Sequence, residues 1–182
     1  MITTPLTQDA SARNLGAKPL WASVAATGVP ATPLPASRNQ MQVRRRFLTT
    51  GGDALNLDTI HQNATFILVL EGKTEDALPH HALLTQGLPA GWEVVGRIPD
   101  GDAAGLPWLK DLTEVEAQAA AVDRFAAVVA LDHDKPDFRL AIRLRATTPG
   151  SFELPGAEVA DMYAPAIYAR QGVNRIQVLP PE

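Results

Sequence analysis

The residues of this 182-residue chain that could do chemistry are few and widely spaced. Asp132, His133 and Asp134 bring together two carboxylates and an imidazole, side chains that bind metal ions in proteins. Three adjacent ligands on one turn, with no distant partner, make a poor cage for a cation. We interpret the segment as a hairpin turn and expect no metal site in the chain.

The remaining reactive side chains give no better catalytic site. His80 and His81 point to opposite faces if the backbone is extended, so they cannot serve one site, and we expect both at the surface. Glu114 and Glu116 share a face of an extended segment, but nothing around them in the sequence favours proton transfer. The serines lie outside the Gly-x-Ser-x-Gly context of an activated nucleophile: Ser11, Ser23, Ser37 and Ser151. We therefore expect no catalytic residue, no cofactor and no enzymatic activity.

The elements that would position these side chains are strands. Apolar residues alternate strictly along one segment, with arginines and one alanine on its other face: Phe138, Leu140, Ile142, Leu144 and Ala146 against Arg139, Ala141, Arg143 and Arg145. This period of two is typical of a half-buried antiparallel strand. Residues 123–131 alternate in the same way, and the polar stretch 132–136 connects the two strands. The pattern predicts a β-meander within an all-β antiparallel sandwich of the immunoglobulin-like kind, with few short helical turns.

Upstream segments add further strands. Residues 41–50 have the pattern of a strand that carries Arg44, Arg45 and Arg46. Three adjacent arginines could bind a ligand, but on a strand they alternate between the two faces, so we expect a solvated surface. Residues 51–53 turn the chain. The segment 64–71 is apolar on both faces and predicts a central strand covered from both sides.

One segment has two interpretations. Thr113 and Glu116 have the spacing of a helix capping box, and residues 117–122 are good helix formers. An extended edge strand that runs toward residues 123–125 is the other interpretation. We favour the strand.

Composition bounds the function. A net charge of −4 argues against a nucleic-acid partner, because binding phosphates requires clustered cations. The absence of cysteine excludes disulfides and thiolate catalysis and leaves the redox compartment open. No segment has the roughly 20 apolar residues of a membrane helix, so we expect no direct membrane contact. The first residues lack the features of a signal peptide, and we expect any export signal to precede them in a longer parent.

Five segments in a fixed order carry a family resemblance: residues 87–94, 106–109, 123–145, 146–155 and 159–165. In this order they resemble the C-terminal macroglobulin-like domain (MG10, receptor-binding-like) of bacterial α2-macroglobulins. The resemblance covers residues 41–182, which would form the macroglobulin-like β-sandwich. Residues 31–40 would be a proline-rich linker, and residues 1–30 would close the preceding CUB-like region or pair with the main sandwich.

The resemblance implies a function without catalysis. The parent would be a periplasmic, broad-spectrum protease trap anchored to the inner membrane as a lipoprotein, with the thioester and CUB-like domains and target proteases as its partners. Met162 and Tyr163 would shield an internal thioester carried by a neighbouring domain. Asp161, Trp108 and Leu109 are candidate interface residues.

Two alternatives stay open at this level. Met162 and Tyr163 could simply pack an irregular segment against the sandwich, together with Val159. The domain could also belong to a thioester-less relative and bind a cell-envelope partner such as a class A penicillin-binding protein. Exposed apolar residues such as Trp21, Trp108 and Leu109 could serve that role.

Overall fold

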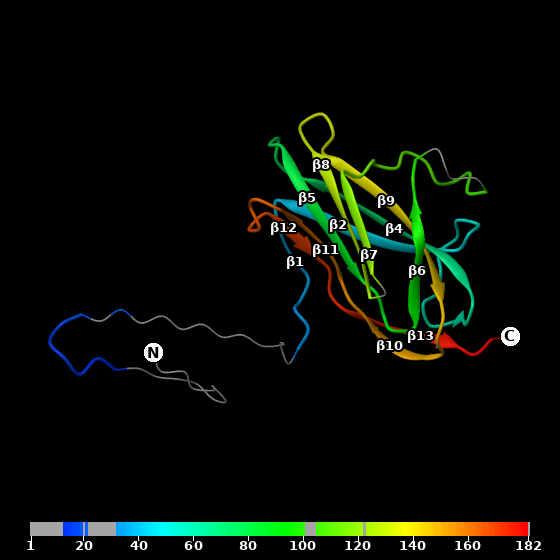
Figure 1. Cartoon of the computed structure of the whole chain (residues 1–182), viewed down its shortest axis with the longest axis horizontal. Coiled ribbons are helices and arrows are strands. Elements are labelled where there is room, and N and C mark those ends of the chain that lie inside the picture. The colour runs from blue at the N-terminus through cyan, green and yellow to red at the C-terminus, as the bar shows by residue number, and fades with distance from the viewer. Residues whose placement is uncertain (1–12, 20, 22–31, 101–104, 122, 182) are drawn as a thin grey trace. The chain divides into compact units, whose positions relative to one another are not determined.

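The computed structural model describes residues 13–19, 21, 32–100, 105–121 and 123–181. The chain divides into two units, residues 1–31 and residues 32–182. Most of residues 1–30 lie outside the described residues, and the assignment of residues 1–30 to a CUB-like region stays a prediction. The second unit carries all the strands described below (Figure 1).

Three sheets make up the second unit, and its described residues contain no helix. The six-stranded sheet has the order β1 (Ser37–Asn39), β12 (Tyr168–Arg170), β11 (Ala157–Asp161), β5 (His80–Gly87), β8 (Arg124–Leu131) and β7 (Ala117–Ala121). The four-stranded sheet has the order β2 (Met41–Leu48), β4 (Thr65–Thr74), β9 (Asp137–Ala146) and β6 (Trp92–Ile98). The small sheet has the order β10 (Gly150–Leu154), β13 (Asn174–Leu179) and β3 (Ile60–His61).

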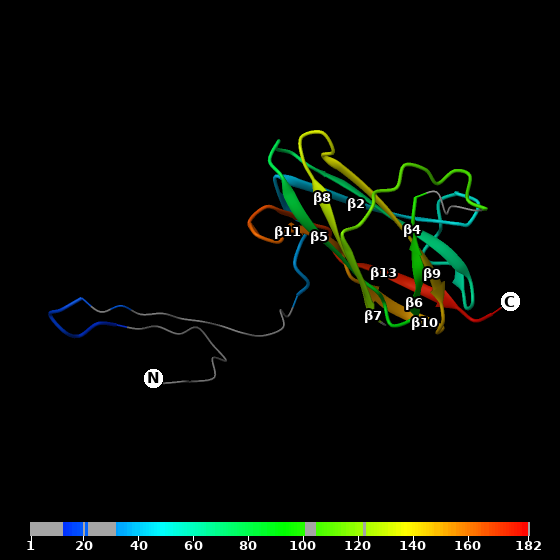
Figure 2. The same ribbon diagram turned by 45° about the horizontal axis from the view of Figure 1, so that its top comes forward.

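The six-stranded and four-stranded sheets form the two layers of a sandwich (Figures 1 and 2). Every strand pair is antiparallel except the short pair of β13 with β3. The core between the layers contains an aromatic cluster in which Phe66 and Trp92 meet edge to face with their ring centroids 4.8 Å apart. The predicted all-β antiparallel sandwich is confirmed.

The alternation along β9 is confirmed for the face that meets the main core, but the other face is not wholly in water, because Ala141 is buried in a second, smaller core. Phe138, Leu140, Ile142 and Leu144 are buried in the main core, and Arg145 on the other face is exposed. The predicted meander, however, is wrong. β8 pairs with β5 and β7, whereas β9 pairs with β4 and β6, so the connection at residues 132–136 crosses from one sheet to the other and is not a hairpin. A period of two identifies the buried face of a strand, but it does not identify the neighbouring strand.

The strand predicted at residues 41–50 is β2, but its arginines are not all solvated. Arg45 lies on the inner face between Val43 and Phe47, and its Nη1 donates to the Pro155 carbonyl oxygen. Burial lowers the pKa of Arg45 to about 10. The expectation of a solvated surface is therefore wrong for this residue, because alternation along β2 places the middle arginine toward the interior.

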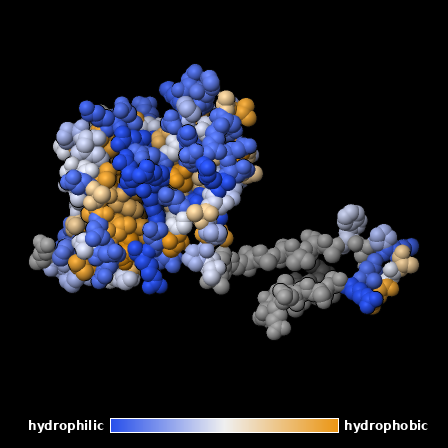
Figure 3. Space-filling view, turned by 180° about the vertical axis from the view of Figure 1, so that it is seen from behind, coloured by the Kyte–Doolittle hydropathy of each residue, from blue (hydrophilic) through white to orange (hydrophobic). Residues whose placement is uncertain are grey.

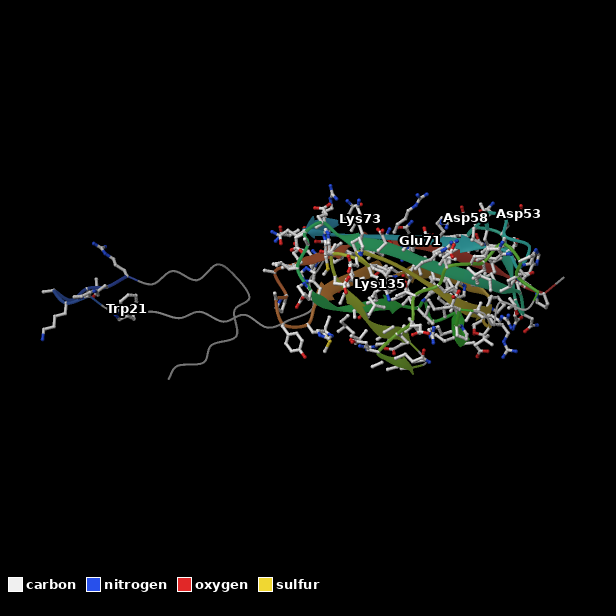
Figure 4. All side chains as sticks on the ribbon, turned by 90° about the horizontal axis from the view of Figure 1, so that it is seen from above. Trp21, Asp53, Asp58, Glu71, Lys73 and Lys135 are labelled. Atoms are coloured by element: carbon white, nitrogen blue, oxygen red, sulfur yellow. The ribbon has the colours of Figure 1, made fainter. Side chains whose placement is uncertain are left out.

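The outer face of the four-stranded sheet carries charges. Figure 4 shows Glu71 and Lys73 on the same side of β4, and Glu71 binds both Arg46 and Arg139. Seen from the side opposite to Figure 1, the domain is mostly hydrophilic, and hydrophobic residues gather mainly in one patch (Figure 3).

The predicted central strand is β4, which lies between β2 and β9 and is buried on both faces from Phe66 to Leu70.

The end of the expected linker and the ambiguous segment both form strands. The expected linker at residues 31–40 ends in a strand, because β1 pairs with β12 at the edge of the six-stranded sheet. The ambiguous segment forms the edge strand β7, as favoured above, paired only with β8. The Thr113 hydroxyl accepts a hydrogen bond from the Arg139 backbone N–H at 2.9 Å instead of capping a helix.

Candidate functional site

The candidate site is the turn that follows β11, where Asp161 ends the strand and Met162 and Tyr163 begin the turn. Asp161 is buried, at 5% exposed, while Met162 is 48% exposed and Tyr163 is 81% exposed. The Tyr163 ring meets the His81 ring edge to face at 5.7 Å. A buried carboxylate therefore stands directly before two large side chains that face solvent in the described structure.

Hydrogen bonds hold the backbone of this turn at several points. One oxygen of Asp161, Oδ1, accepts the backbone N–H groups of Tyr163 and Ala164, each at 2.7 Å. The Met162 N–H donates to the His81 carbonyl oxygen at 3.0 Å, and the Asp161 N–H donates to the Ile167 carbonyl oxygen at the same distance. The exposed pair therefore sits on an ordered backbone, with both side chains largely accessible and the Tyr163 ring against His81.

The second oxygen of Asp161 reaches a buried histidine. His80, the first residue of β5, is only 4% exposed, and its Nδ1 lies 2.7 Å from Asp161 Oδ2. Its Nε2 lies 2.7 Å from Oδ1 of Asp76, in the connection between β4 and β5. The expectation that His80 is a surface residue is therefore wrong, because β5 turns its first side chain inward.

The charges of the three groups support one another. Burial on its own lowers the pKa of His80, but the two carboxylates together raise it above its usual value of 6.5. Burial on its own raises the pKa of Asp161, but the hydrogen bonds from His80 and from the turn N–H groups bring it below 3.8. The hydrogen bond from His80 also lowers the pKa of Asp76. The cluster is thus most stable as a cation between two anions.

This arrangement suits support of the turn better than catalysis. Each ring nitrogen of His80 already faces a carboxylate, so neither is available to take a proton from a substrate. Among the described residues, no group of three or more His, Cys, Asp and Glu side chains is placed to hold a metal ion. The same residues contain no helix that could cross a bilayer.

A row of apolar side chains leads away from the turn across the outer face of the six-stranded sheet. The registers of β11, β5, β8 and β7 align Ala160, Leu83, Val128 and Ala117 in that order. Leu83 is 38% exposed. No charged residue interrupts the row at these four aligned positions. A flat apolar strip of this kind suits contact with another folded domain.

The other candidate residues lie elsewhere. Leu109 is buried in a second, smaller core with Ile67 and Ile98, so the expectation that it is exposed is wrong. Trp108 is half-buried and donates its Nε1–H to the Thr50 carbonyl oxygen at 3.1 Å. Asp161 is buried, and its contribution to an interface would be indirect, through the turn. An interface role of these residues stays a prediction.

His81 and Asp132, two further candidates from the sequence, both lie at the surface. His81 is exposed, as expected, and binds Glu116 at 2.8 Å. Asp132 accepts the backbone N–H groups of Asp134 and Lys135, which is the local role of an aspartate in a turn.

Comparison with known proteins identifies the family. Residues 41–166 match the family described as the bacterial α2-macroglobulin MG10 domain. The chain belongs to the bacterial α2-macroglobulin family. The relative from Escherichia coli K12, an α2-macroglobulin, is 31% identical over 179 residues, which is 92% of this chain and 11% of that protein. An α2-macroglobulin of Xylella fastidiosa is 28% identical over 88% of this chain and 10% of its own length.

Solved structures agree with this assignment. The native E. coli α2-macroglobulin, solved from domain MG7 to the C-terminus, superposes with a TM-score of 0.73 at 26% identity, covering 84% of this chain and 25% of that one. The E. coli protein activated by porcine elastase gives a TM-score of 0.71 at 26% identity over 84% of this chain and 14% of that one. The MG10 domain described here spans about a tenth of the length of the relatives it matches in sequence.

Sequence reasoning missed two residues of this MG10 domain, Asp76 and His80. Asp76 lies in a polar segment that reads as a simple connection, and His80 looked like half of a surface pair. One signal was present: His80 begins an alternation in which Ala82 and Leu84 share its face. That period places His80 on the buried side, where a charged group requires partners.

Proposed function

We propose that this domain is the C-terminal domain of a protease-trapping α2-macroglobulin of the bacterial periplasm, and that its Met162–Tyr163 turn covers a reactive thioester in a neighbouring domain. The observation that carries the proposal is the pairing of a firmly held backbone with two exposed, largely apolar side chains. Large side chains that are exposed together on a fixed backbone, beside a further apolar row, indicate a contact site for another protein surface.

The chemistry of the pair suits this role. A thioester hydrolyses when water reaches it, so its lifetime depends on the groups that cover it. A thioether adapts to an irregular surface, and a tyrosine ring adds an apolar face with a polar tip. The domain itself would catalyse nothing, since the attacking protease supplies the cleavage and the trap supplies stored strain.

The apolar row beside the turn supports a role in domain contact. Ala160, Leu83 and Val128 would extend the covered surface beyond the turn itself, toward the same neighbouring domain. The partners in this proposal are the thioester and CUB-like domains of the parent chain, and target proteases are engaged by the parent as a whole.

The mechanism in this proposal is release by protease cleavage. A relative from E. coli is known in a form activated by porcine elastase. By analogy, cleavage of a bait segment in the parent of this domain would move the domains apart and withdraw Met162 and Tyr163 from the thioester. The parent would be a lipoprotein anchored to the inner membrane, which places the trap where foreign proteases enter.

The experiment uses the full-length parent protein with Met162→Ala and Tyr163→Ala combined. We expect faster loss of methylamine reactivity on storage in the variant than in the wild type, because water reaches the thioester. Val95→Ala is the matched control, since Val95 is 53% exposed on the other sheet. Equal thioester lifetimes in the double variant and the wild type would contradict the shielding role.

A parent that lacks the thioester would support the second candidate function. The exposed turn and the apolar row would then bind a cell-envelope protein, such as a class A penicillin-binding protein. Methylamine would have no effect on the wild-type parent or on the double variant.

A further inference from the structure

We infer that Asp76, His80 and Asp161 form a positioning triad that holds the Met162–Tyr163 turn in place, and that the triad does so only while His80 carries its second proton. The inference rests on the proposed function for its biological purpose, but its geometry is independent of any thioester. The hydrogen bonds of Asp76 and His80 lead to the turn through Asp161, so both act through that residue.

The hydrogen-bond chain is continuous. Asp76 Oδ1 binds His80 Nε2, His80 Nδ1 binds Asp161 Oδ2, and Asp161 Oδ1 accepts the N–H groups of Tyr163 and Ala164. Asp76 is itself fixed, because its Oδ1 accepts the Leu78 backbone N–H at 3.0 Å. Three separate elements, the β4–β5 connection, β5 and β11, are thus joined at the base of one turn.

The count of protons makes the chain sensitive to pH. A neutral imidazole has one N–H donor and one lone pair, whereas an imidazolium has two N–H donors. Both ring nitrogens of His80 lie 2.7 Å from carboxylate oxygens. Only the imidazolium can donate to both carboxylates, and its loss sets a nitrogen lone pair against a carboxylate oxygen.

Within the described part of the chain, the charged groups that act on His80 come from two elements: Asp76 from the β4–β5 connection and Asp161 from β11. On its other side, β8 places Leu131 opposite His80 in register. The charged neighbours in the sequence are engaged elsewhere: Glu75 with Arg38, and His81 with Glu116. Two anions against one cation favour the imidazolium, and the pKa of His80 is accordingly raised.

A purely structural role would leave the turn unaffected by the titration of His80. A positioning role predicts that the turn loosens as His80 loses its proton, so that local opening at Tyr163 and Ala164 follows the titration. The two roles therefore differ in a pH profile.

The test uses the isotope-labelled 182-residue chain between pH 5 and 9. Imidazole nitrogen spectra are expected to show His80 doubly protonated at the acid end of this range, with a midpoint above the usual 6.5. Amide hydrogen exchange at Tyr163 and Ala164, corrected for its intrinsic pH dependence, is expected to rise about tenfold or more through the same midpoint. Asp76→Asn should move both midpoints to lower pH together, and His133→Gln, which changes an exposed histidine of the β8–β9 connection, should move neither.

A neutral His80 throughout this range, or exchange at Tyr163 and Ala164 that ignores the titration, would overturn the inference. The wild-type titration decides the question even if a variant fails to fold. Because these readouts need no thioester, the triad stands or falls separately from the shielding role, which the lifetime of the parent's thioester tests.

Discussion

Asp161→Ala tests how far the turn depends on one buried side chain. Asp161 is 5% exposed and accepts three hydrogen bonds, one from His80 and two from the turn N–H groups. The substitution removes all three and leaves Asp76 as the one remaining carboxylate partner of the His80 cation. Breaking a buried charge pair by deleting one member costs about 3–5 kcal/mol. We expect the free energy of unfolding to fall by about that amount.

Urea unfolding followed by tryptophan fluorescence measures this loss, because Trp92 is buried in the core and becomes exposed on unfolding. In a thermal scan, each kcal/mol of lost stability lowers the Tm by about 2–4 °C, so we expect a Tm lower by roughly 6–20 °C. Glu158→Ala is the matched control, since Glu158 lies on the same strand with its side chain 53% exposed and its carboxylate 3.9 Å from Arg170. We expect the control to change stability by less than about 1 kcal/mol. Equal losses in the two variants would refute the reasoning.

Three further predictions follow from the same structure. The stability supplied by protonated His80 is fully present below pH 6.5 and is lost as the pH rises through its raised folded pKa, so urea midpoints should fall over that range. Gly72→Ala should destabilise by about 1–3 kcal/mol, because the new Cβ would lie 2.0 Å from the Gln42 carbonyl oxygen. Leu68→Ala in the core should cost about 2–5 kcal/mol in urea unfolding.

Each of these predictions has a control or a contrary outcome. The His80→Gln variant should be less stable than the wild type at pH 6, and its urea midpoint should no longer fall as the pH rises. A wild-type urea midpoint that stays constant over this pH range would contradict the prediction. Gly96→Ala is the control for Gly72, since no atom lies within 4 Å of the added Cβ and the change should stay within about 1 kcal/mol. A loss below 1 kcal/mol for Leu68→Ala would show that the core collapses around the cavity.

Local patterns predicted the strands well. The alternation from Phe138 to Ala146 identified the buried face of β9, because a strand with one wet face must alternate. The same pattern could not place β8 and β9 in different sheets. A short polar connection has the same residue types whether it joins two strands of one sheet or crosses between the two sheets of a sandwich. The packing of strands distant in the sequence decides which of the two connections forms.

The site was predicted in part. The resemblance drew attention to Met162 and Tyr163, but their exposure and the support beneath them come from the fold. His80 and Asp161 are 81 positions apart in sequence, and the adjacency of β5 and β11 brings them together. Arg45 shows the same limit in part. Its alternation with Val43 and Phe47 indicates the inner face, but the Pro155 carbonyl oxygen to which it donates lies 110 positions away in the sequence.

In the proposed function, the Met162–Tyr163 turn is covered in the intact parent protein and uncovered on activation. Oxidation of methionine by dilute peroxide, read by mass spectrometry, measures this directly. Met162 is 48% exposed in the domain and Met41 is 0% exposed, so Met41 is an internal control for unfolding.

In the isolated chain, Met162 should oxidise readily and Met41 should not. In the full-length parent, the account predicts that Met162 is protected until a protease cleaves the bait segment, after which its oxidation rate rises to that of the isolated chain. Oxidation of Met162 at the same rate in the intact parent and in the isolated chain would contradict the account.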